Sequence, residues 1–420
     1  MINWVFDKPD NFINMTRCPS TVINNGELLS GRFPVPNLIW YWTEAHRWAK
    51  GQNVETKVYS VDNRPNRYIY NIGTWTNPAV WTGLQGNQFG YRNMFEYVPI
   101  EVLEDARNCR AILAIDNLAE GFYDESLYEF WHASCTCYNI PPSSILYLTS
   151  NELDRRGYHA WATRNNVTDT INIVGFCHFE YQFQKFANDH PCMTWDEHIA
   201  RKTTLGRRVK TFNCLNRVNR EHREFFIIKL IEAGLHKYGT VSHNKINFDY
   251  WRGWYTPVET LDTAEKLLPF IADDSDFNNN KSMQFNPDLY LNSWISVVTE
   301  THAAEEPHNF FISEKTWKPI YAMHPFMVLG HKGTLSRLHE MGYKTFDGLI
   351  DESYDQRDFF PRANAIINNL QFLNSIRDKM AWFEGCKDIC LHNRNVFLAR
   401  DFFESKEYND IIALYNNIKK

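Results

Sequence analysis

The chain has 420 residues, with 44 Lys and Arg against 50 Asp and Glu and a formal net charge of −6. This length exceeds the roughly 250 to 300 residues that a single core organises, so two domains are expected. The acidic balance disfavours a protein held as a whole on nucleic acid or anionic lipid. No run approaches the roughly 18 apolar residues of a membrane span, and no leader-like segment opens the chain. We therefore expect a cytoplasmic protein without a transmembrane segment.

Nine cysteines, an odd number scattered over a long chain, are typical of reduced thiols. Two clusters resemble metal-ligand sets, His132-x-x-Cys135-x-Cys137 and Cys386-x-x-x-Cys390-x-His392. Neither has a second half at the spacing of a zinc site, so we predict buried thiols that hold no metal.

In the first half of the chain, four apolar runs are predicted strands and one segment is a predicted helix. The strands are 37–42, 109–115, 144–149 and 171–175, and the helix is 125–138. Strands interleaved with helices favour a parallel sheet covered on both faces. We assign residues 1–200 to an amino-terminal α/β domain, and we interpret 190–208 as a connector.

The alternation restarts in the second half. The predicted elements are a strand at 209–215, a loop at 216–220, a helix at 221–233 ended by Gly234, an exposed loop at 273–288, strands at 291–298 and 326–329, and a helix at 334–341 closed by Gly342. We expect them to form a second α/β domain, residues 205–385. A helical tail, 386–420, is expected to pack back on the amino-terminal domain.

The segment around Ser313 carries an acid and two bases into the first turn of a predicted helix. Ser313 is a suitable cap, and the helix start would leave free N–H groups for a phosphate. Lys315 and Lys318 can lie on one side of that turn and add positive charge. Glu314 can accept from ribose hydroxyls. The other interpretation, a helix start with solvated charges, stays open.

Arg217, Arg220 and Arg223 follow the first strand of the same domain and open its first helix. Each alone fits a solvated basic helix start. A helix that starts at the carboxyl end of a parallel strand also favours the binding of an anion at its first turn. Together the three arginines indicate a crevice for a diphosphate.

These motifs occur in the order in which the donor domain of the α1,3-fucosyltransferases carries its own. The matching stretches are Arg223 to Leu230, Gly239 to Asn244, Thr299-Glu300-Thr301, and Phe311-Ile312-Ser313-Glu314-Lys315 before a Pro-apolar-apolar-apolar-Gly strand. The stretch from Val209 to Gly342 therefore resembles that domain. The resemblance implies a GT-B-like fold, in which two Rossmann-like domains face each other across a cleft.

By the same resemblance, Arg223 and Lys315 would bind the donor diphosphate, Glu314 the ribose, and Glu300 would lie beside the nucleotide. Phe311 stands where the family has Tyr, Thr299 where it has Phe, and Thr301 where it has Asn. These departures leave the base and the sugar open, so a fucose donor is not assumed.

An inverting enzyme needs a general base on the acceptor side, and a carboxylate or His after a strand suits that task. Asp116 and Glu120 are the best placed, with Glu44, His178 and Glu180 as rivals; each also fits a surface or capping role. Asp274-Ser275-Asp276 resembles a metal-binding Asp-x-Asp, although it also reads as a solvated loop.

The sequence thus predicts a metal-independent glycosyltransferase that needs no cofactor besides its nucleotide-sugar donor. Inversion is what the resemblance implies, and the residues themselves leave inverting and retaining chemistry open. A hydroxyl of a glycan, a lipid-linked saccharide, a protein or a modified nucleic acid remains open as the acceptor. The alternative is a non-catalytic carbohydrate-binding or interaction protein that uses the many aromatic side chains.

Overall fold

The structure, a computed structural model, describes residues 2–6, 23–24, 27–28, 54–58, 62, 64–74, 95, 98–118, 121, 125–189, 193–216, 218–253, 257–272, 285–303 and 308–418. The chain forms two compact units. Unit 1 comprises Met1–His178, Pro307–Phe311 and Asp401–Lys420, and unit 2 comprises Phe179–Glu306 and Ile312–Arg400. The units therefore divide the chain differently from the sequence-based boundaries: residues 179–200 fall in unit 2, and the predicted tail is shared between the units.

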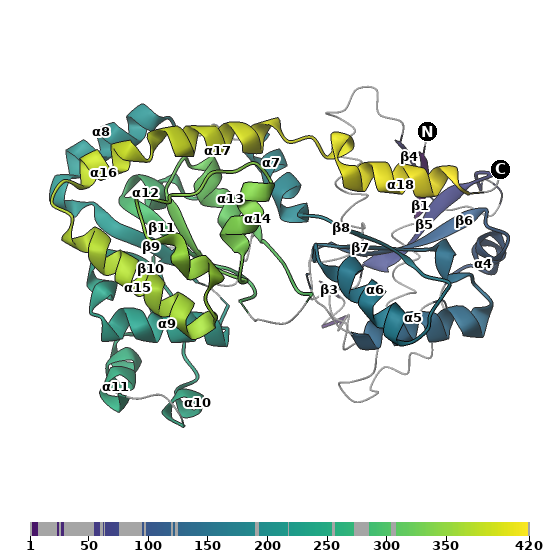
Figure 1. Cartoon of the computed structure of the whole chain (residues 1–420), viewed down its shortest axis with the longest axis horizontal. Helices are drawn as coiled ribbons and strands as arrows, with labels where there is room; N and C mark the ends of the chain where they lie inside the picture. The colour runs from purple at the N-terminus through teal and green to yellow at the C-terminus, as the bar shows by residue number, and fades with distance from the viewer. Residues whose placement is uncertain are drawn as a thin grey trace. The chain divides into compact units, whose positions relative to one another are not determined.

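Unit 1 contains a parallel sheet, with six strands among the described residues. Across the sheet these strands are β4 (Val54–Val58), β1 (Ile2–Phe6), β5 (Tyr68–Thr74), β6 (Ala111–Asn117), β7 (Ile145–Thr149) and β8 (Asn172–Gly175). A two-stranded antiparallel pair, β2 (Ile23–Asn24) and β3 (Glu27–Leu28), belongs to the same unit. The helices of this unit within the described residues are α4 (Ile100–Arg107), α5 (Glu125–Tyr138), α6 (Asp154–Arg164) and α18 (Lys406–Asn416) (Figure 1).

Aromatic side chains fill much of the core of unit 1. The rings of Trp131 on α5 and Tyr147 on β7 have centroids 4.5 Å apart, and both residues are buried. Tyr128 packs edge-on to Tyr158 on α6 at 5.1 Å. Large rings bury much apolar area each, so part of the high aromatic content of the sequence serves this core.

A short segment of unit 1, residues 308–311, comes from the middle of the sequence of unit 2. The amide of Asn151 holds it: Nδ2 donates to the carbonyl of His308 at 2.8 Å, and Oδ1 accepts from the N–H of Phe310 at 2.9 Å. The Phe311 ring lies against Gly121, where a Cβ would overlap it. The segment is thus fixed by both hydrogen bonds and packing within unit 1.

Unit 2 contains a second parallel sheet, with four strands in the described part of the chain. Their order is β10 (Gly239–Ser242), β9 (Lys210–Leu215), β11 (Ser293–Thr299) and β12 (Phe326–Leu329). Every residue of β11 is buried, as expected for a central parallel strand covered on both faces. The strand order reverses between β9 and β11, which makes their carboxyl ends the switch point of this sheet.

Helices surround this sheet (Figure 1). They are α7 (His178–Asp189), α8 (Trp195–Leu205), α9 (Glu221–Glu232), α10 (Phe248–Arg252), α11 (Val258–Leu267), α12 (Pro287–Leu291), α13 (Glu314–Tyr321), α14 (Thr334–Glu340), α15 (Phe359–Ser375), α16 (Lys379–Gly385) and α17 (Lys387–Ala399). Helix α15 packs against β9, β12 and α9, and α13 packs against β11, β12 and α17. An α/β class with two parallel sheets is confirmed.

The predicted connector at 190–208 is wrong for residues 195–205, which form α8. Its start has a capping box: Thr194 Oγ1 accepts from the N–H of Glu197 at 3.2 Å, and the Glu197 carboxylate accepts from the N–H of Thr194 at 2.6 Å. A Thr followed three residues later by Glu is a sequence signal for a helix start, and it outweighs the charged composition. Strand β10 was also missed, since Gly239–Ser242 is short and only one of its residues is buried.

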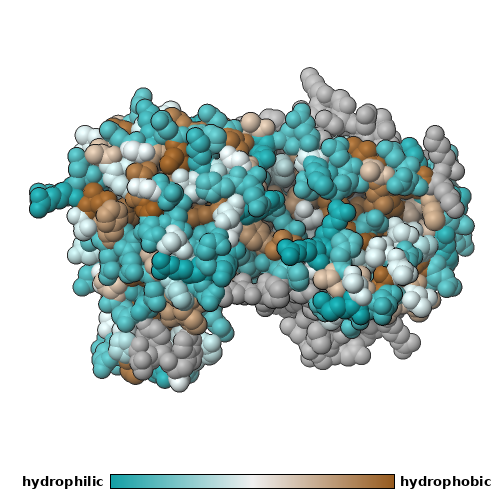
Figure 2. Space-filling model, viewed as in Figure 1, coloured by the Kyte–Doolittle hydropathy of each residue, from teal (hydrophilic) through white to brown (hydrophobic). Residues whose placement is uncertain are grey.

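No helix within the described residues is long and apolar enough to cross a membrane. Figure 2 shows hydrophilic side chains over much of the visible face and hydrophobic ones in separate small patches. Among the described cysteines named above, Cys135, Cys386 and Cys390 are buried free thiols, whereas Cys137 is exposed, against the prediction.

Candidate functional site

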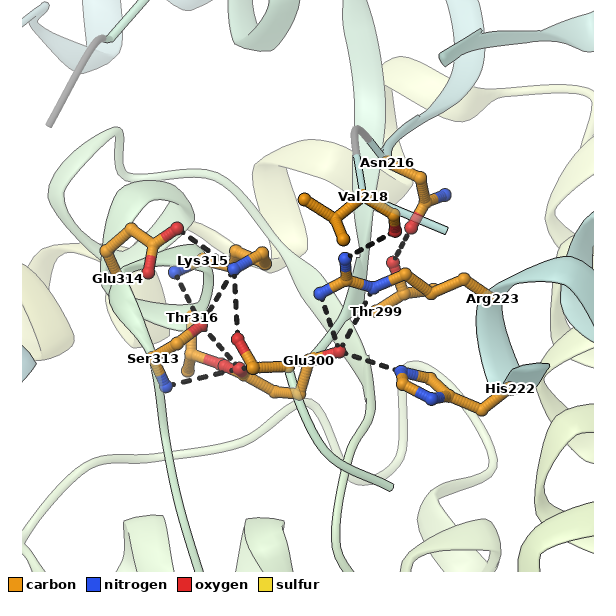
Figure 3. A network of polar contacts seen from close by, with 11 residues as sticks. Asn216, Val218, His222, Arg223, Thr299, Glu300, Ser313, Glu314, Lys315 and Thr316 are labelled. Carbon is orange, nitrogen blue, oxygen red and sulfur yellow. Dashed lines mark hydrogen bonds and ion pairs between the residues drawn. The ribbon is translucent and has the colours of Figure 1, made fainter. Parts of the chain in front are cut away.

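Polar side chains from three parts of unit 2 converge where β9 and β11 end (Figure 3). They come from the loop and first turn after β9, from Glu300 and Thr301 after β11, and from the start of α13. Because β9 and β11 are adjacent parallel strands, their carboxyl ends meet at one edge of the sheet. This edge is the position at which open α/β sheets bind ligands.

The Glu300 carboxylate is the hub of this cluster, and the residue is fully buried. Its Oε2 accepts from the N–H and the hydroxyl of Ser313 at 3.1 and 2.5 Å and from the N–H of Thr301 at 3.0 Å. Its Oε1 accepts from the Thr316 hydroxyl at 2.6 Å. Gly330, at the end of β12, leaves room for it, because a Cβ there would lie 3.2 Å from Glu300 Cγ. Glu300 therefore fixes the first turn of α13 from inside the protein.

The backbone carbonyl of Glu300 is held from the other side by α9. His222 Nε2 donates to it at 2.8 Å, and Arg223 donates from Nη2 at 2.9 Å and from Nε at 3.2 Å. Arg223 Nη1 also donates to the carbonyl of Val218 at 3.0 Å. Burial, together with the charge of Arg220, lowers the pKa of Arg223 to about 10, so it stays charged at neutral pH. In this arrangement Arg223 positions the loops; its direct contact with a diphosphate stays a prediction.

The first turn of α13 contradicts the expectation of free N–H groups. Ser313 is the N-cap, as predicted, and its Oγ accepts from the N–H of Lys315 at 3.4 Å. The N–H of Thr316 donates to the Ser313 carbonyl at 3.3 Å, and Glu314 accepts from its own backbone N–H. Because the chain satisfies these donors itself, they are not offered to a phosphate.

The charges on α13 are partly paired. Lys315 Nζ donates to Glu314 Oε1 at 2.9 Å and to the hydroxyls of Thr301 and Ser313 at 3.2 Å each. Burial acts to raise the pKa of Glu314, but Lys315 and Lys318 outweigh it and the pKa is lowered. Burial lowers the pKa of Lys318 to about 8. Glu314 is therefore an ionised acceptor, and α13 carries one more positive than negative charge here.

The loop after β9 contributes a second basic group. Arg220 is the N-cap residue of α9 and makes no side-chain capping bond. Its Nε is buried and has no hydrogen-bond partner among the described residues. In the same loop, Asn216 accepts a hydrogen bond from the hydroxyl of Thr299, which joins the ends of β9 and β11. Arg217 lies outside the described residues.

Phe311 is predicted to be a donor-binding residue of the second domain. It belongs to unit 1 instead, where its ring packs on Gly121. Asp116 lies at the end of β6, but its side chain is outside the described residues. Glu120, Glu44 and the Asp274 to Asp276 triplet are outside them as well.

The remaining rivals for the base are buried. Glu180 accepts from Arg400 Nε at 3.0 Å and from the Tyr343 hydroxyl, all within unit 2. His178 is 2% exposed, and burial lowers its pKa to about 3. A general base must reach the substrate hydroxyl, so neither has the exposure that this role needs.

No protein-family model and no curated protein matches this chain. The site is therefore interpreted from its own geometry.

Sequence reasoning missed two residues that hold Glu300. His222 donates to its backbone carbonyl, and Thr316 donates to its carboxylate. The sequence did carry a signal for both, since His222 lies between Arg220 and Arg223 and Thr316 follows Lys315. Within the described residues, no group of three or more His, Cys, Asp or Glu is arranged to hold a metal ion.

Proposed function

We propose that this protein is a glycosyltransferase with a GT-B-like arrangement, which binds a nucleotide-sugar at the β9–β11 edge of unit 2. One observation carries the proposal: an ionised Glu314 and three bases lie at the switch point of this sheet, the bases being Arg220, Lys315 and Lys318. Hydrogen bonds of Glu300 to Arg223 and to Ser313 hold the loops in place there. Acidic groups bind ribose hydroxyls and basic groups bind phosphates at such edges.

The contacts suggest a division of roles within the site. Lys318 has no hydrogen-bond partner among the described residues, and Arg220 has a buried N–H without an acceptor. These two cations are better placed for phosphate than Lys315, which is tied to Glu314. Glu314 would accept from the ribose, and Arg223 and Glu300 would keep the two loops in register.

Unit 1 would present the acceptor, and Asp116 or Glu120 would deprotonate its hydroxyl. The acceptor oxygen would then attack the anomeric carbon from the face opposite the leaving nucleoside diphosphate. The new C–O bond forms as the bond to the diphosphate breaks, the proton passes to the carboxylate, and the configuration inverts. We propose that the diphosphate charge is balanced by side chains and that no metal takes part. Glycan, lipid-linked saccharide, protein and modified nucleic acid remain the acceptor classes.

The non-catalytic carbohydrate-binding alternative needs exposed aromatic rings on one surface. Among the described aromatic residues, those with highly exposed side chains are Tyr238, Tyr250, Phe360 and Phe372. They lie on three different elements, and many other rings are in the cores. Because so many of the described rings are used in the cores, we place this alternative second.

Calorimetric titration of the full chain with UDP, GDP, ADP and CMP tests the proposal, with and without EDTA. We expect one nucleotide to bind in both conditions and Lys318→Met to weaken it about tenfold or more, since a charge-assisted contact is lost. Lys406→Met is the matched control, because Lys406 is an exposed lysine paired with Asp410 on α18 of unit 1. Binding of no nucleotide by the wild-type chain would overturn the proposal.

Turnover is tested separately by incubating a panel of nucleotide-sugars with the chain and measuring the release of nucleoside diphosphate. We expect slow hydrolysis of the donor whose nucleotide binds. Asp116→Asn and Glu120→Gln then identify the base, because only the base variant should lose turnover while nucleotide binding is retained. Tight nucleotide binding without release from any donor would favour a binding protein.

A further inference from the structure

The 308–311 segment is held in unit 1 by the turn that follows β7. Asn151 Nδ2 donates to the His308 carbonyl at 2.8 Å, and Asn151 Oδ1 accepts from the N–H of Phe310 at 2.9 Å. The N–H of Glu152 donates to the Phe310 carbonyl at 3.2 Å. Asn151 is fully buried, so these hydrogen bonds form away from bulk water and are costly to break. The turn therefore fixes the backbone of the segment at two residues.

The residue that follows Ile312 is held in unit 2. Ser313 donates its N–H and its hydroxyl to the Glu300 carboxylate, at 3.1 and 2.5 Å (Figure 3). Ser313 is also the N-cap of α13, and its Oγ accepts from the N–H of Lys315. The position of Ser313 thus sets the position of the first turn of α13, which carries Glu314.

Two residues, Phe311 and Ile312, separate Phe310 from Ser313. Both are buried, and the Phe311 ring packs on Gly121 within unit 1. Closely packed side chains transmit a displacement instead of absorbing it, and two residues of backbone offer few torsions that could relax. A change in how unit 1 holds the segment is therefore passed along the chain to the N-cap of α13.

We propose that Asn151 of unit 1 is a positioning residue for the nucleotide site of unit 2. It acts through the 308–311 segment, which holds Ser313 and with it Glu314 and Lys318 on α13. The inference rests on the proposed function in taking this site to bind a nucleotide. When the amide of Asn151 is lost, fewer molecules keep the first turn of α13 in place, and the observed nucleotide affinity falls by that fraction.

Two substitutions of Asn151 test this role. Asn151→Ala removes both the donor and the acceptor of the side chain. Asn151→Ser keeps a hydroxyl that can accept from the N–H of Leu153, as Asn151 Oδ1 does at 3.1 Å, so the local turn is retained while the grip on the segment is lost. If Asn151→Ala does not fold, Asn151→Ser decides. Near-ultraviolet circular dichroism verifies the fold of each variant.

Asn172→Ala is the matched control. Asn172 Nδ2 also donates to two backbone carbonyls of unit 1, those of Ser143 and Ile145, at 2.8 and 3.0 Å. These carbonyls lie at the start of β7, whereas Asn151 follows its end. The control therefore removes a comparable pair of hydrogen bonds from the same unit without touching the 308–311 segment.

The first measurement is hydrogen exchange of the full chain without ligand. Peptides that cover 313–321 should exchange at least about fivefold faster in both Asn151 variants, because the first turn of α13 opens more often. Peptides that cover β9, in the same unit, should keep the wild-type rate. Asn172→Ala should leave both regions unchanged. A role of Asn151 confined to unit 1 would not alter exchange in α13.

The second measurement is calorimetric titration of the same proteins with UDP, GDP, ADP and CMP. The nucleotide that binds the wild type should bind Asn151→Ala and Asn151→Ser at least about fivefold more weakly. Asn172→Ala should bind it with wild-type affinity.

The two measurements separate this inference from the proposed function. Faster exchange of 313–321 in the Asn151 variants, with no nucleotide bound by the wild type, supports the link from Asn151 to α13 and refutes the nucleotide-sugar role. Nucleotide binding with wild-type affinity by the folded Asn151 variants overturns the inference and spares the proposed function. Unchanged exchange of 313–321 in those variants also overturns it, because Asn151 would then act within unit 1 alone.

Discussion

Replacement of Glu300 by Ala removes the acceptor for four hydrogen bonds. Three of the donors, the N–H and hydroxyl of Ser313 and the hydroxyl of Thr316, belong to residues that are at most 1% exposed. A buried donor left without an acceptor costs about 1 to 3 kcal/mol, so the range is roughly 3 to 9 kcal/mol. We expect about 4 kcal/mol, because a hydroxyl can rotate to another acceptor whereas the N–H cannot.

Glu300→Gln provides the matched comparison. An amide oxygen at the position of Oε2 keeps the bonds from Ser313, and the amide N–H₂ can donate to Thr316 Oγ1. Only the charge assistance is lost, so we expect a cost of about 1 to 2 kcal/mol.

The assay is urea unfolding combined with hydrogen exchange of peptides that cover 293–321. Glu340→Ala is the control, since Glu340 forms only an exposed pair with Arg337 and should cost at most about 0.5 kcal/mol. The reasoning fails if Glu300→Ala loses less than about 1 kcal/mol, or no more than Glu300→Gln, because the buried donors would then carry no penalty.

Three further predictions concern packing and protonation. Gly121→Val should destabilise the protein by about 1 to 3 kcal/mol through overlap with the Phe311 ring, and Phe311→Ala should relieve that effect in the double variant, as measured by thermal melting. Burial lowers the pKa of His178 and His198 to about 3. The unfolded chain therefore binds more protons than the folded one below pH 6.5. The contribution of each histidine to the free energy of unfolding is fully present above that pH and falls by about 1.4 kcal/mol per pH unit towards pH 3. Urea midpoints at pH 7 and 5 should show this loss, and an unchanged midpoint would contradict it. Burial also lowers the pKa of Lys202, whose Nζ lies 4.2 Å from the centre of the Phe383 ring, to about 7. The unfolded chain therefore binds this proton more tightly, and the stability of the wild type relative to Lys202→Met, measured by urea unfolding, should increase between pH 7.5 and 9.5.

Much of the fold could be predicted from local pattern. Helix 125–138 and strand 326–329 have the predicted bounds, because apolar periodicity and apolar runs are local properties. Gly234 and Gly342 have positive φ angles of 67° and 90° beyond their helices, where a residue without Cβ is favoured. The charged composition of 195–205 does not indicate a helix, whereas the capping box of Thr194 and Glu197 does.

The site was harder to predict, because the partner of each side chain is decided by tertiary contacts. The sequence identified Ser313 as a cap and placed Glu300 nearby, but it could not show that the Glu300 carboxylate turns to α13. Nor could it show that the Arg223 guanidinium faces two backbone carbonyls. Both depend on how β9, β11 and β12 align, and no local pattern encodes this.

The 308–311 segment restricts how the protein can be divided. Unit 1 takes these residues from within the sequence of unit 2, so neither unit is a single continuous stretch of chain. A recombinant fragment of residues 179–400 would carry Phe310 and Phe311 without Asn151 and Gly121, leaving two large rings uncovered directly before Ile312 and Ser313. Such a fragment should aggregate or bind nucleotide poorly, whatever the intrinsic affinity of the site. Donor binding is therefore best measured on the full chain, or on a circularly permuted one that keeps the segment and its partners together.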